Sequence, residues 1–264
     1  LIYLTQSQLE EAKQEFEKAL ELDPKQYSAY NNLAAIAQGQ GNLSEAERMY
    51  LKSVQLNANN PDAYYNLGLL YIQQKKHVQA KTALEKVTQL NPENLDAFYV
   101  LGTVYSELQD YYAAIANLQF VVFNQPQILE ARVALAEMYR RQGKYPIALN
   151  ELKGAVELAP EDPDIYQHLG LIFLETAKGE LAIEVFERVL SLDPNRAEAY
   201  EILAILYDLI NEQERAIACI EKAMELNPDN ERTRQVMEEI QEKTRQMLAS
   251  TESPQESSSE SNPS

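Results

Sequence analysis

The sequence repeats itself every 34 residues. When Pro61 is taken as position 1 of the repeating unit, position 7 is leucine in six consecutive copies, from Leu33 to Leu203. Position 20 is alanine in seven copies, from Ala12 to Ala216. Position 8 is always alanine or glycine, and position 32 is proline in six of seven copies. A period of this length, held without insertion or deletion, predicts an array of similar units.

Each unit is predicted to be a pair of helices. Apolar residues fall at positions 4, 7, 8 and 11 and again at positions 20, 24, 27 and 28, which is helical spacing. A short turn such as Gly41-Asn42 separates the two stretches, and Asn-Pro or Asp-Pro ends most copies of the second. The small residues at positions 8 and 20 are expected to let the two helices approach closely. One hairpin buries too little apolar surface to be stable alone, so we expect the stacked array to be the folding unit.

This pattern resembles the tetratricopeptide repeat (TPR) family. The resemblance implies an all-α fold, a right-handed superhelical solenoid of helix-turn-helix repeats. The predicted organisation is a partial repeat at residues 1–26, six full repeats at 27–60, 61–94, 95–128, 129–162, 163–196 and 197–230, a capping helix at 231–248 and a disordered Ser/Glu-rich tail at 249–264. Because Leu1 falls within a repeat, we expect the sequence to be a fragment whose upstream part is missing.

The composition restricts the class of partner. The formal net charge of −18 disfavours nucleic acid and anionic membrane surfaces, and it favours a partner of basic character. The sequence contains no apolar run near the ~20 residues that a membrane span needs. The single cysteine, Cys219, is expected to be a half-buried, unreactive thiol. The compartment stays open, with the cytoplasm favoured.

The sequence carries no recognisable catalytic or cofactor-binding motif. His77 and His168 lie in different repeats, too far apart to share a metal ion or a proton. The chain has no glycine-rich phosphate loop, no paired cysteines and no nucleophile elbow. We therefore expect a non-catalytic protein with no cofactor and no metal, and the sequence leaves its oligomeric state open.

The expected binding surface is the concave groove that, in the family it resembles, the first helices of the hairpins line. Positions 2, 5, 9, 12 and 13 share one face of those helices. Acidic residues recur there, at Asp62, Asp96, Glu107, Glu130, Glu137, Asp164, Glu175, Glu198, Glu201 and Asp208, and only Arg140 and Arg141 oppose them. Apolar residues lie between the acids, at Tyr65, Leu69, Ile72, Tyr99, Leu171, Leu174, Ile205 and Leu209. The mixture favours a basic, amphipathic partner segment. The alternative is that the apolar residues pack against the next hairpin.

Two binding patterns of the TPR family can be compared with these positions. The carboxylate clamp that holds acidic tails matches only at Asn66, so we expect it to be absent. An asparagine ladder at position 6, which grips an extended peptide backbone in some members, is present at Asn32 and Asn66 and stops at Val100. The predicted peptide-binding groove comprises Asn32, Asp62, Tyr65, Asn66, Leu69, Ile72, Asp96, Tyr99, Thr103 and Glu130.

Two departures from the repeat pattern also carry expectations. Arg132 replaces the aromatic residue at position 4, which either loosens the neighbouring junction or marks a contact there. Phe120 occupies a position that is usually basic and is therefore a candidate contact on the outer surface. In the alternative, Phe123 covers for the missing leucine at position 30, and Phe120 tilts inward with it.

Three functions are compatible with the sequence. The first is a scaffold or adaptor that holds a partner polypeptide in the concave groove. The second is the regulatory or substrate-recruiting region of an enzyme, such as a glycosyltransferase or kinase, whose catalytic domain lies upstream. The third is a factor in envelope or organelle assembly, such as pilus or photosystem biogenesis. The sequence upstream of Leu1 would discriminate among them.

Overall fold

The computed structural model describes residues 6–251, and these residues form helices and no strand. The all-α fold expected from the sequence is confirmed. The helices are α1 (Gln6–Leu22), α2 (Tyr27–Gly39), α3 (Leu43–Leu56), α4 (Pro61–Gln73), α5 (His77–Leu90), α6 (Leu95–Glu107), α7 (Tyr111–Asn124), α8 (Leu129–Arg141), α9 (Tyr145–Leu158), α10 (Pro163–Glu175), α11 (Gly179–Leu192), α12 (Ala197–Leu209), α13 (Gln213–Leu226) and α14 (Glu231–Thr251).

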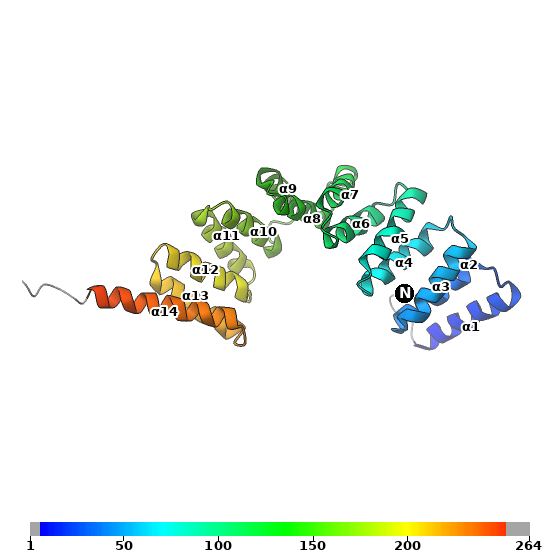
Figure 1. Ribbon diagram of the computed structural model, residues 1–264, viewed down its shortest axis with the longest axis horizontal. Coiled ribbons are helices and arrows are strands. Elements are labelled where there is room, and N and C mark those ends of the chain that lie inside the picture. The colour runs from blue at the N-terminus through cyan, green and yellow to red at the C-terminus, as the bar shows by residue number, and fades with distance from the viewer. Residues whose placement is uncertain (1–5, 252–264) are drawn as a thin grey trace, which may run out of the picture. The chain divides into compact units, whose positions relative to one another are not determined.

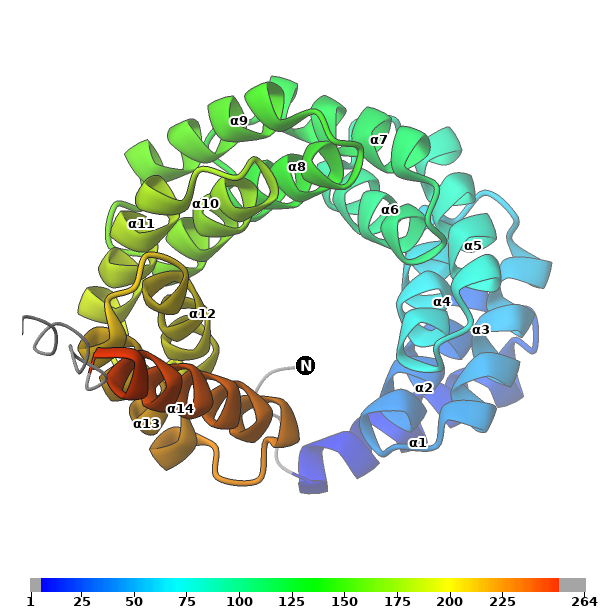
Figure 2. The same cartoon turned by 60° about the vertical axis from the view of Figure 1, so that its left-hand side comes forward.

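The chain divides into two compact units, Leu1–Glu151 and Leu152–Ser264, and the division falls within α9. In the first unit, α2, α4, α6 and α8 form an inner layer, and α3, α5 and α7 lie outside it (Figures 1 and 2). In the second unit, α10 and α12 form one layer and α11 and α13 the other, while α14 packs against α12 and α13. Each unit is therefore built from two layers of helices.

The turn inside each hairpin has the same geometry in six copies. One residue per turn, always at position 15, has a positive φ: Gly41 (79°), Lys75 (58°), Gln109 (60°), Gly143 (70°), Ala177 (55°) and Asn211 (63°). The N–H of the following residue donates to the carbonyl at position 11, as Lys76 does to Tyr71 at 2.8 Å. This is the Schellman arrangement that ends a helix. The second helix then begins at once, in two copies with a side-chain cap at Asn42 or Asp110.

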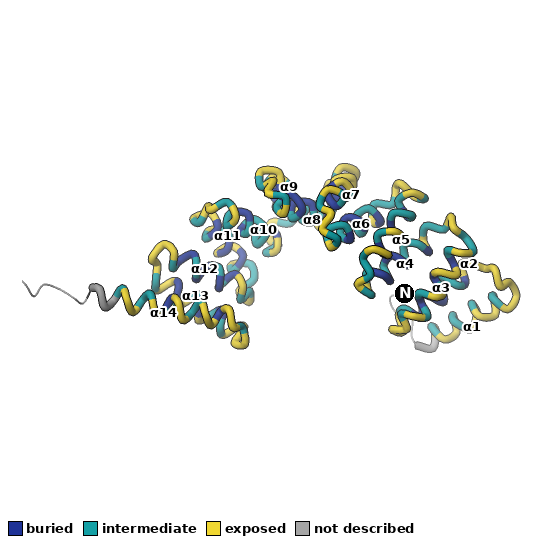
Figure 3. The backbone as a smooth tube through the Cα atoms, in the orientation of Figure 1, coloured by how far each residue is buried: buried dark blue, intermediate teal, exposed yellow. Residues whose placement is uncertain are grey.

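The core lies between the two layers, where Figure 3 shows the buried positions. The alanine at position 20 is fully buried in every copy from Ala46 to Ala216. At position 8, a Cβ added to Gly102 would lie 2.8 Å from Cγ of Leu118, and one added to Gly170 would lie 2.7 Å from the Phe186 ring. In these two copies, Leu118 and Phe186 at position 24 therefore fill the place that a Cβ at position 8 would take.

Recurring polar contacts also connect neighbouring elements. The side chain at position 4 donates to the carbonyl of the proline six residues earlier, from Tyr166 at 2.9 Å and from Arg132 at 2.7 Å. Arg132 also pairs with Glu151 at 2.9 Å, so the substituted position forms a contact. At position 11, the hydroxyl of Tyr105 donates to Glu85 in the preceding hairpin at 2.5 Å. These contacts supplement the apolar packing between successive hairpins.

Helix α14 closes the second unit. Val236, Met237 and Ile240 pack against the core formed by α11, α12 and α13. The helix runs to Thr251, three residues beyond the predicted end at residue 248. The extension is reasonable because Ala249 favours helix, whereas Pro254 is the first residue that cannot continue one. The remainder of the predicted tail, residues 252–264, and residues 1–5 of the partial repeat lie outside the described residues.

Candidate peptide-binding face

The predicted groove residues lie on the inner layer of the first unit, and we call the surface they form the inner face. Caps position its acidic residues: Asn60 precedes α4 and accepts from the N–H of Asp62, and Asn94 caps α6. As a result, Asp62 and Asp96 fall in the first turns of their helices, as Glu130 does in α8. All three side chains are exposed. The positive end of each helix dipole favours a carboxylate at this place.

Two tyrosines of the inner layer, Tyr65 of α4 and Tyr99 of α6, are half-buried. Burial, followed by the negative charge of Asp96, raises the pKa of the Tyr65 hydroxyl. Burial, followed by the charge of Glu130, raises the pKa of the Tyr99 hydroxyl in the same way. The first-turn acid of one inner helix thus acts electrostatically on the tyrosine of the preceding inner helix. We call Tyr65 with Asp96, and Tyr99 with Glu130, the tyrosine–acid pairs.

Amide side chains connect α2 to α4. The amide of Asn66 donates to Asn31 at 3.2 Å, and that of Gln38 donates to Gln73 at 2.9 Å. Asn66 of the predicted ladder thus bonds Asn31, whereas the ladder's role in gripping a peptide backbone stays a prediction. Asn32 is half-buried and makes no side-chain hydrogen bond within the described residues. Both amide bridges join residues 35 apart, so a search at the repeat period of 34 misses them.

The other predicted residues of the inner face are partly covered. Tyr65 and Ile72 are partly buried and pack against the core of the first hairpins. For these two residues, the alternative that the apolar residues pack within the array is therefore partly correct. Leu69 is half-buried. The Thr103 hydroxyl donates to the carbonyl of Val100 at 2.8 Å, which leaves only its lone pairs for a partner. These side chains present an apolar floor between the acids.

The charge of the inner face is not neutralised from within the first three inner helices. Helices α2, α4 and α6 contain no lysine and no arginine. Arg140 and Arg141 of α8 both bind Glu137, at 2.7 Å each. Within the described residues, the carboxylates of Asp62, Asp96 and Glu130 form no ion pair. The first unit therefore presents unpaired acids on this layer.

The second unit differs, because basic residues from outside those inner positions pair with some of its acids. Asp208 pairs with Lys243 at 3.0 Å. Glu201, which is buried, pairs with Arg232 at 3.0 Å and accepts from the Thr233 hydroxyl at 2.7 Å. The partners come from the following helix, α14, outside the inner positions that the sequence comparison considered.

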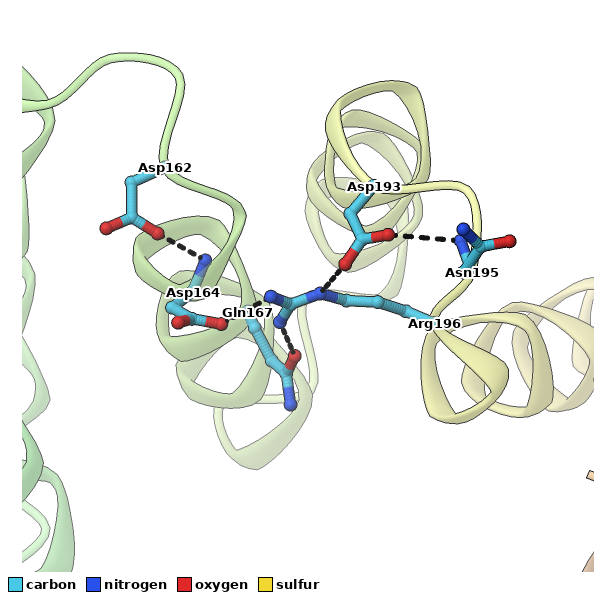
Figure 4. A network of polar contacts seen from close by, with 6 residues as sticks. All are labelled: Asp162, Asp164, Gln167, Asp193, Asn195 and Arg196. Atoms are coloured by element: carbon cyan, nitrogen blue, oxygen red, sulfur yellow. Dashed lines mark hydrogen bonds and ion pairs between the residues drawn. The ribbon is translucent and has the colours of Figure 1, made fainter. Parts of the chain in front are cut away.

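Arg196 neutralises a third acid of the second unit. It precedes α12 and reaches back to α10, where it contacts Asp164 at 2.5 Å and the Gln167 side chain at 2.6 Å (Figure 4). Its Nε donates to Asp193 at 2.9 Å. Arg196 occupies position 34, which is asparagine, aspartate or isoleucine in the full repeats before it. The substitution was a visible signal, but only the structure shows which acid it meets.

The hollows and aromatic side chains of the outer side are separate from the inner face. A pocket of about 520 Å³ lies between α3, α4 and α5, with Leu51, Val54 and Val78 among its lining residues. On α7, Phe123 is 86% exposed, so it does not replace the missing leucine at position 30. Phe120 packs against Phe98 with ring centroids 4.4 Å apart and stays 37% exposed. The lining of this pocket includes none of the predicted groove residues.

Metal binding, thiol reactivity and membrane crossing can also be compared with residues 6–251. These residues hold no group of three or more His, Cys, Asp or Glu side chains arranged for a metal ion. Burial raises the pKa of the Cys219 thiol, which disfavours the reactive thiolate. Among the described helices, none combines the length and apolar character that crossing a bilayer requires.

Comparison with known proteins gives family models along most of the chain. The model of the anaphase-promoting complex, cyclosome, subunit 3 matches residues 39–121, and a TPR repeat model matches residues 136–176. Two tetratricopeptide repeat models match residues 15–48 and residues 1–26, 163–196 and 197–230. No curated protein matches the sequence.

Several solved structures are similar. YrrB, described as a TPR protein with an unusual peptide-binding site, is 27% identical over 70% of this chain and 95% of its own, with a TM-score of 0.64. The C-terminal part of a TPR repeat-containing protein from Cytophaga hutchinsonii is 16% identical over 87% of this chain and 94% of its own, with a TM-score of 0.72. A tetratricopeptide repeat protein from Parabacteroides merdae is 21% identical over 89% of this chain and 93% of its own, with a TM-score of 0.61. Together with the family models, these similarities show that the chain belongs to the tetratricopeptide repeat family.

Proposed function

We propose that the protein is a non-catalytic scaffold that binds a partner polypeptide along the inner face of its first unit. One observation carries the proposal: tyrosine–acid pairs recur on consecutive inner helices, and no basic residue of α2, α4 or α6 neutralises them. A partner that supplies positive charge and apolar groups would complement both components. The peptide-binding site ascribed to YrrB supports the choice of a polypeptide partner.

The two components of the face have different tasks in this proposal. Half-buried tyrosines are rigid anchors that lose little conformational entropy on binding, so they hold the partner. Exposed carboxylates act mainly on the rate of encounter, because solvated charges steer more than they hold. The partner is therefore a basic segment with some apolar side chains.

Affinity capture from extracts of the source cells tests the proposal with three variants. Tyr65→Ala with Tyr99→Ala removes the anchors, and Asp96→Lys with Glu130→Lys reverses the charge. Phe123→Ala, on the outer surface, is the control. Circular dichroism confirms that each variant is folded.

The double tyrosine variant is expected to weaken binding of a captured partner by about 1–3 kcal/mol. The charge-reversed variant is expected to slow association and to reduce its salt dependence, whereas Phe123→Ala recovers partners as the wild type does. Recovery of the same partners at the same strength by both inner-face variants would refute the proposal.

A further inference from the structure

We infer that the partner segment is extended and carries arginine or lysine at every third residue, so that successive basic side chains meet Asp62, Asp96 and Glu130. The inference rests on the proposed function and specifies the ligand of the same face. The three acids occupy the same position of three successive inner helices, α4, α6 and α8.

The spacing of the inner helices sets the spacing of the acids. Side chains of α2 and α4 meet directly, at 3.2 and 2.9 Å in the two amide bridges. Helices α6 and α8 are likewise in contact. Helices in such contact have axes about 10 Å apart. An extended chain advances roughly 3.3 Å per residue, and a polyproline II chain roughly 3.1 Å, so three residues span one interval.

An extended segment fits the face better than a helix for a second reason. The inner face carries amide side chains, of which Asn32 has no hydrogen bond within the described residues. An extended peptide leaves its backbone N–H and C=O groups available to such amides, whereas a helix satisfies them internally. A helix would also rise only about 1.5 Å per residue, so its basic residues would have to be about seven apart.

The tyrosines of the inner face determine which basic residue of the partner segment is preferred opposite each acid. The inner helices before Asp96 and Glu130 carry a tyrosine at position 5, Tyr65 and Tyr99, but the same position before Asp62 is Asn31. A planar guanidinium can stack on an aromatic ring while it pairs with a carboxylate, and an ammonium is a weaker substitute. Arginine is therefore preferred at the two positions that meet tyrosine–acid pairs, and either basic residue suffices opposite Asp62.

The second unit offers a matched control. Its acids Asp164, Glu201 and Asp208 are already occupied by Arg196, Arg232 and Lys243. Glu198 stands at the same repeat position as Asp96 and is exposed, but the residue corresponding to Tyr65 is Gln167. Glu198→Lys thus changes the net charge as Asp96→Lys does without touching a tyrosine–acid pair.

The test uses four synthetic peptides of one composition, with three arginines spaced two, three, four or seven residues apart, and measures their binding to the full chain by fluorescence anisotropy. The spacing of three is expected to bind about tenfold more tightly than the others, as correct register of several charge pairs allows. Asp96→Lys should abolish the preference, and Glu198→Lys should retain it. In the spacing-three peptide, arginine to lysine should weaken binding more at the two positions that meet tyrosines.

Each other outcome is decisive. If all spacings bind equally and still require Tyr65 and Tyr99, the three-residue register is wrong and the proposed function stands. If the spacing of seven binds most tightly, the partner is helical and the inference of an extended segment is overturned. If none of the peptides binds, or binding ignores the tyrosine variants, the inference and its basis in the inner face both fail.

Discussion

Replacing Gly102 by alanine tests the packing that gives the hairpins their shape. The added Cβ would lie 2.8 Å from Cγ and 3.1 Å from Cδ2 of Leu118, which is 1% exposed. Carbon atoms in proteins normally approach to about 3.5–4.0 Å, so the buried Leu118 side chain or the helix must move.

The expected magnitude combines two opposing terms. Overpacking of a filled core costs about 1–3 kcal/mol. Alanine in place of glycine within a helix returns up to about 1 kcal/mol. The sum is a loss of about 1 kcal/mol in the free energy of unfolding for Gly102→Ala. Gly102→Leu, which adds three further carbons at the same place, should cost several times more.

The chain provides a matched substitution in Gly39, the last residue of α2, where an added Cβ meets nothing within 4 Å. Gly39→Ala should be neutral or stabilising by up to about 1 kcal/mol. Urea unfolding followed by circular dichroism should therefore separate the two alanine variants by about 2 kcal/mol. Equal free energies of unfolding for the two variants would refute the packing described for position 8.

Three further predictions concern stability. Ala177→Gly should raise the free energy of unfolding by about 0.5–1 kcal/mol, because Ala177 has a φ of 55° that suits glycine; an unchanged or lower free energy of unfolding would contradict this. Thr233→Val should lower the free energy of unfolding by about 1–3 kcal/mol, because it removes a hydrogen bond from the buried Glu201. An unchanged free energy of unfolding would argue against that contact. Burial, then the hydrogen bond to Glu85, raises the pKa of Tyr105 to about 12. The unfolded tyrosine ionises near 10, so the unfolded state loses its proton first and stability should fall as pH rises from about 10 to 12. Tyr105→Phe should make that fall shallower in unfolding curves recorded across this pH range.

The hairpins could be predicted from the sequence because one repeated pattern specifies them. Leucine at position 7 and alanine at position 20 recur in every copy that contains the position, and proline at position 32 recurs in six of seven. The positive φ at position 15 was harder to foresee, since glycine fills only two of the six turns, at Gly41 and Gly143. The geometry is imposed by the two helices that the turn joins.

The contacts between successive repeats were less accessible from the sequence. Asn66 donates to Asn31 across an offset of 35 residues, one more than the repeat period. Arg196 neutralises Asp164 from a position outside the inner helices, so alignment of those helices alone cannot reveal it. Such pairings depend on where two long side chains converge in space, which periodicity does not encode.

The most direct test of the inner face as the binding surface is selection of random peptides on the immobilised protein, repeated on the Tyr65→Ala, Tyr99→Ala variant. The wild type should select peptides rich in arginine and lysine, and these should bind the variant at least about tenfold more weakly, as expected when two anchors are lost. Selected peptides without basic enrichment, or peptides that bind both proteins equally, would contradict the account.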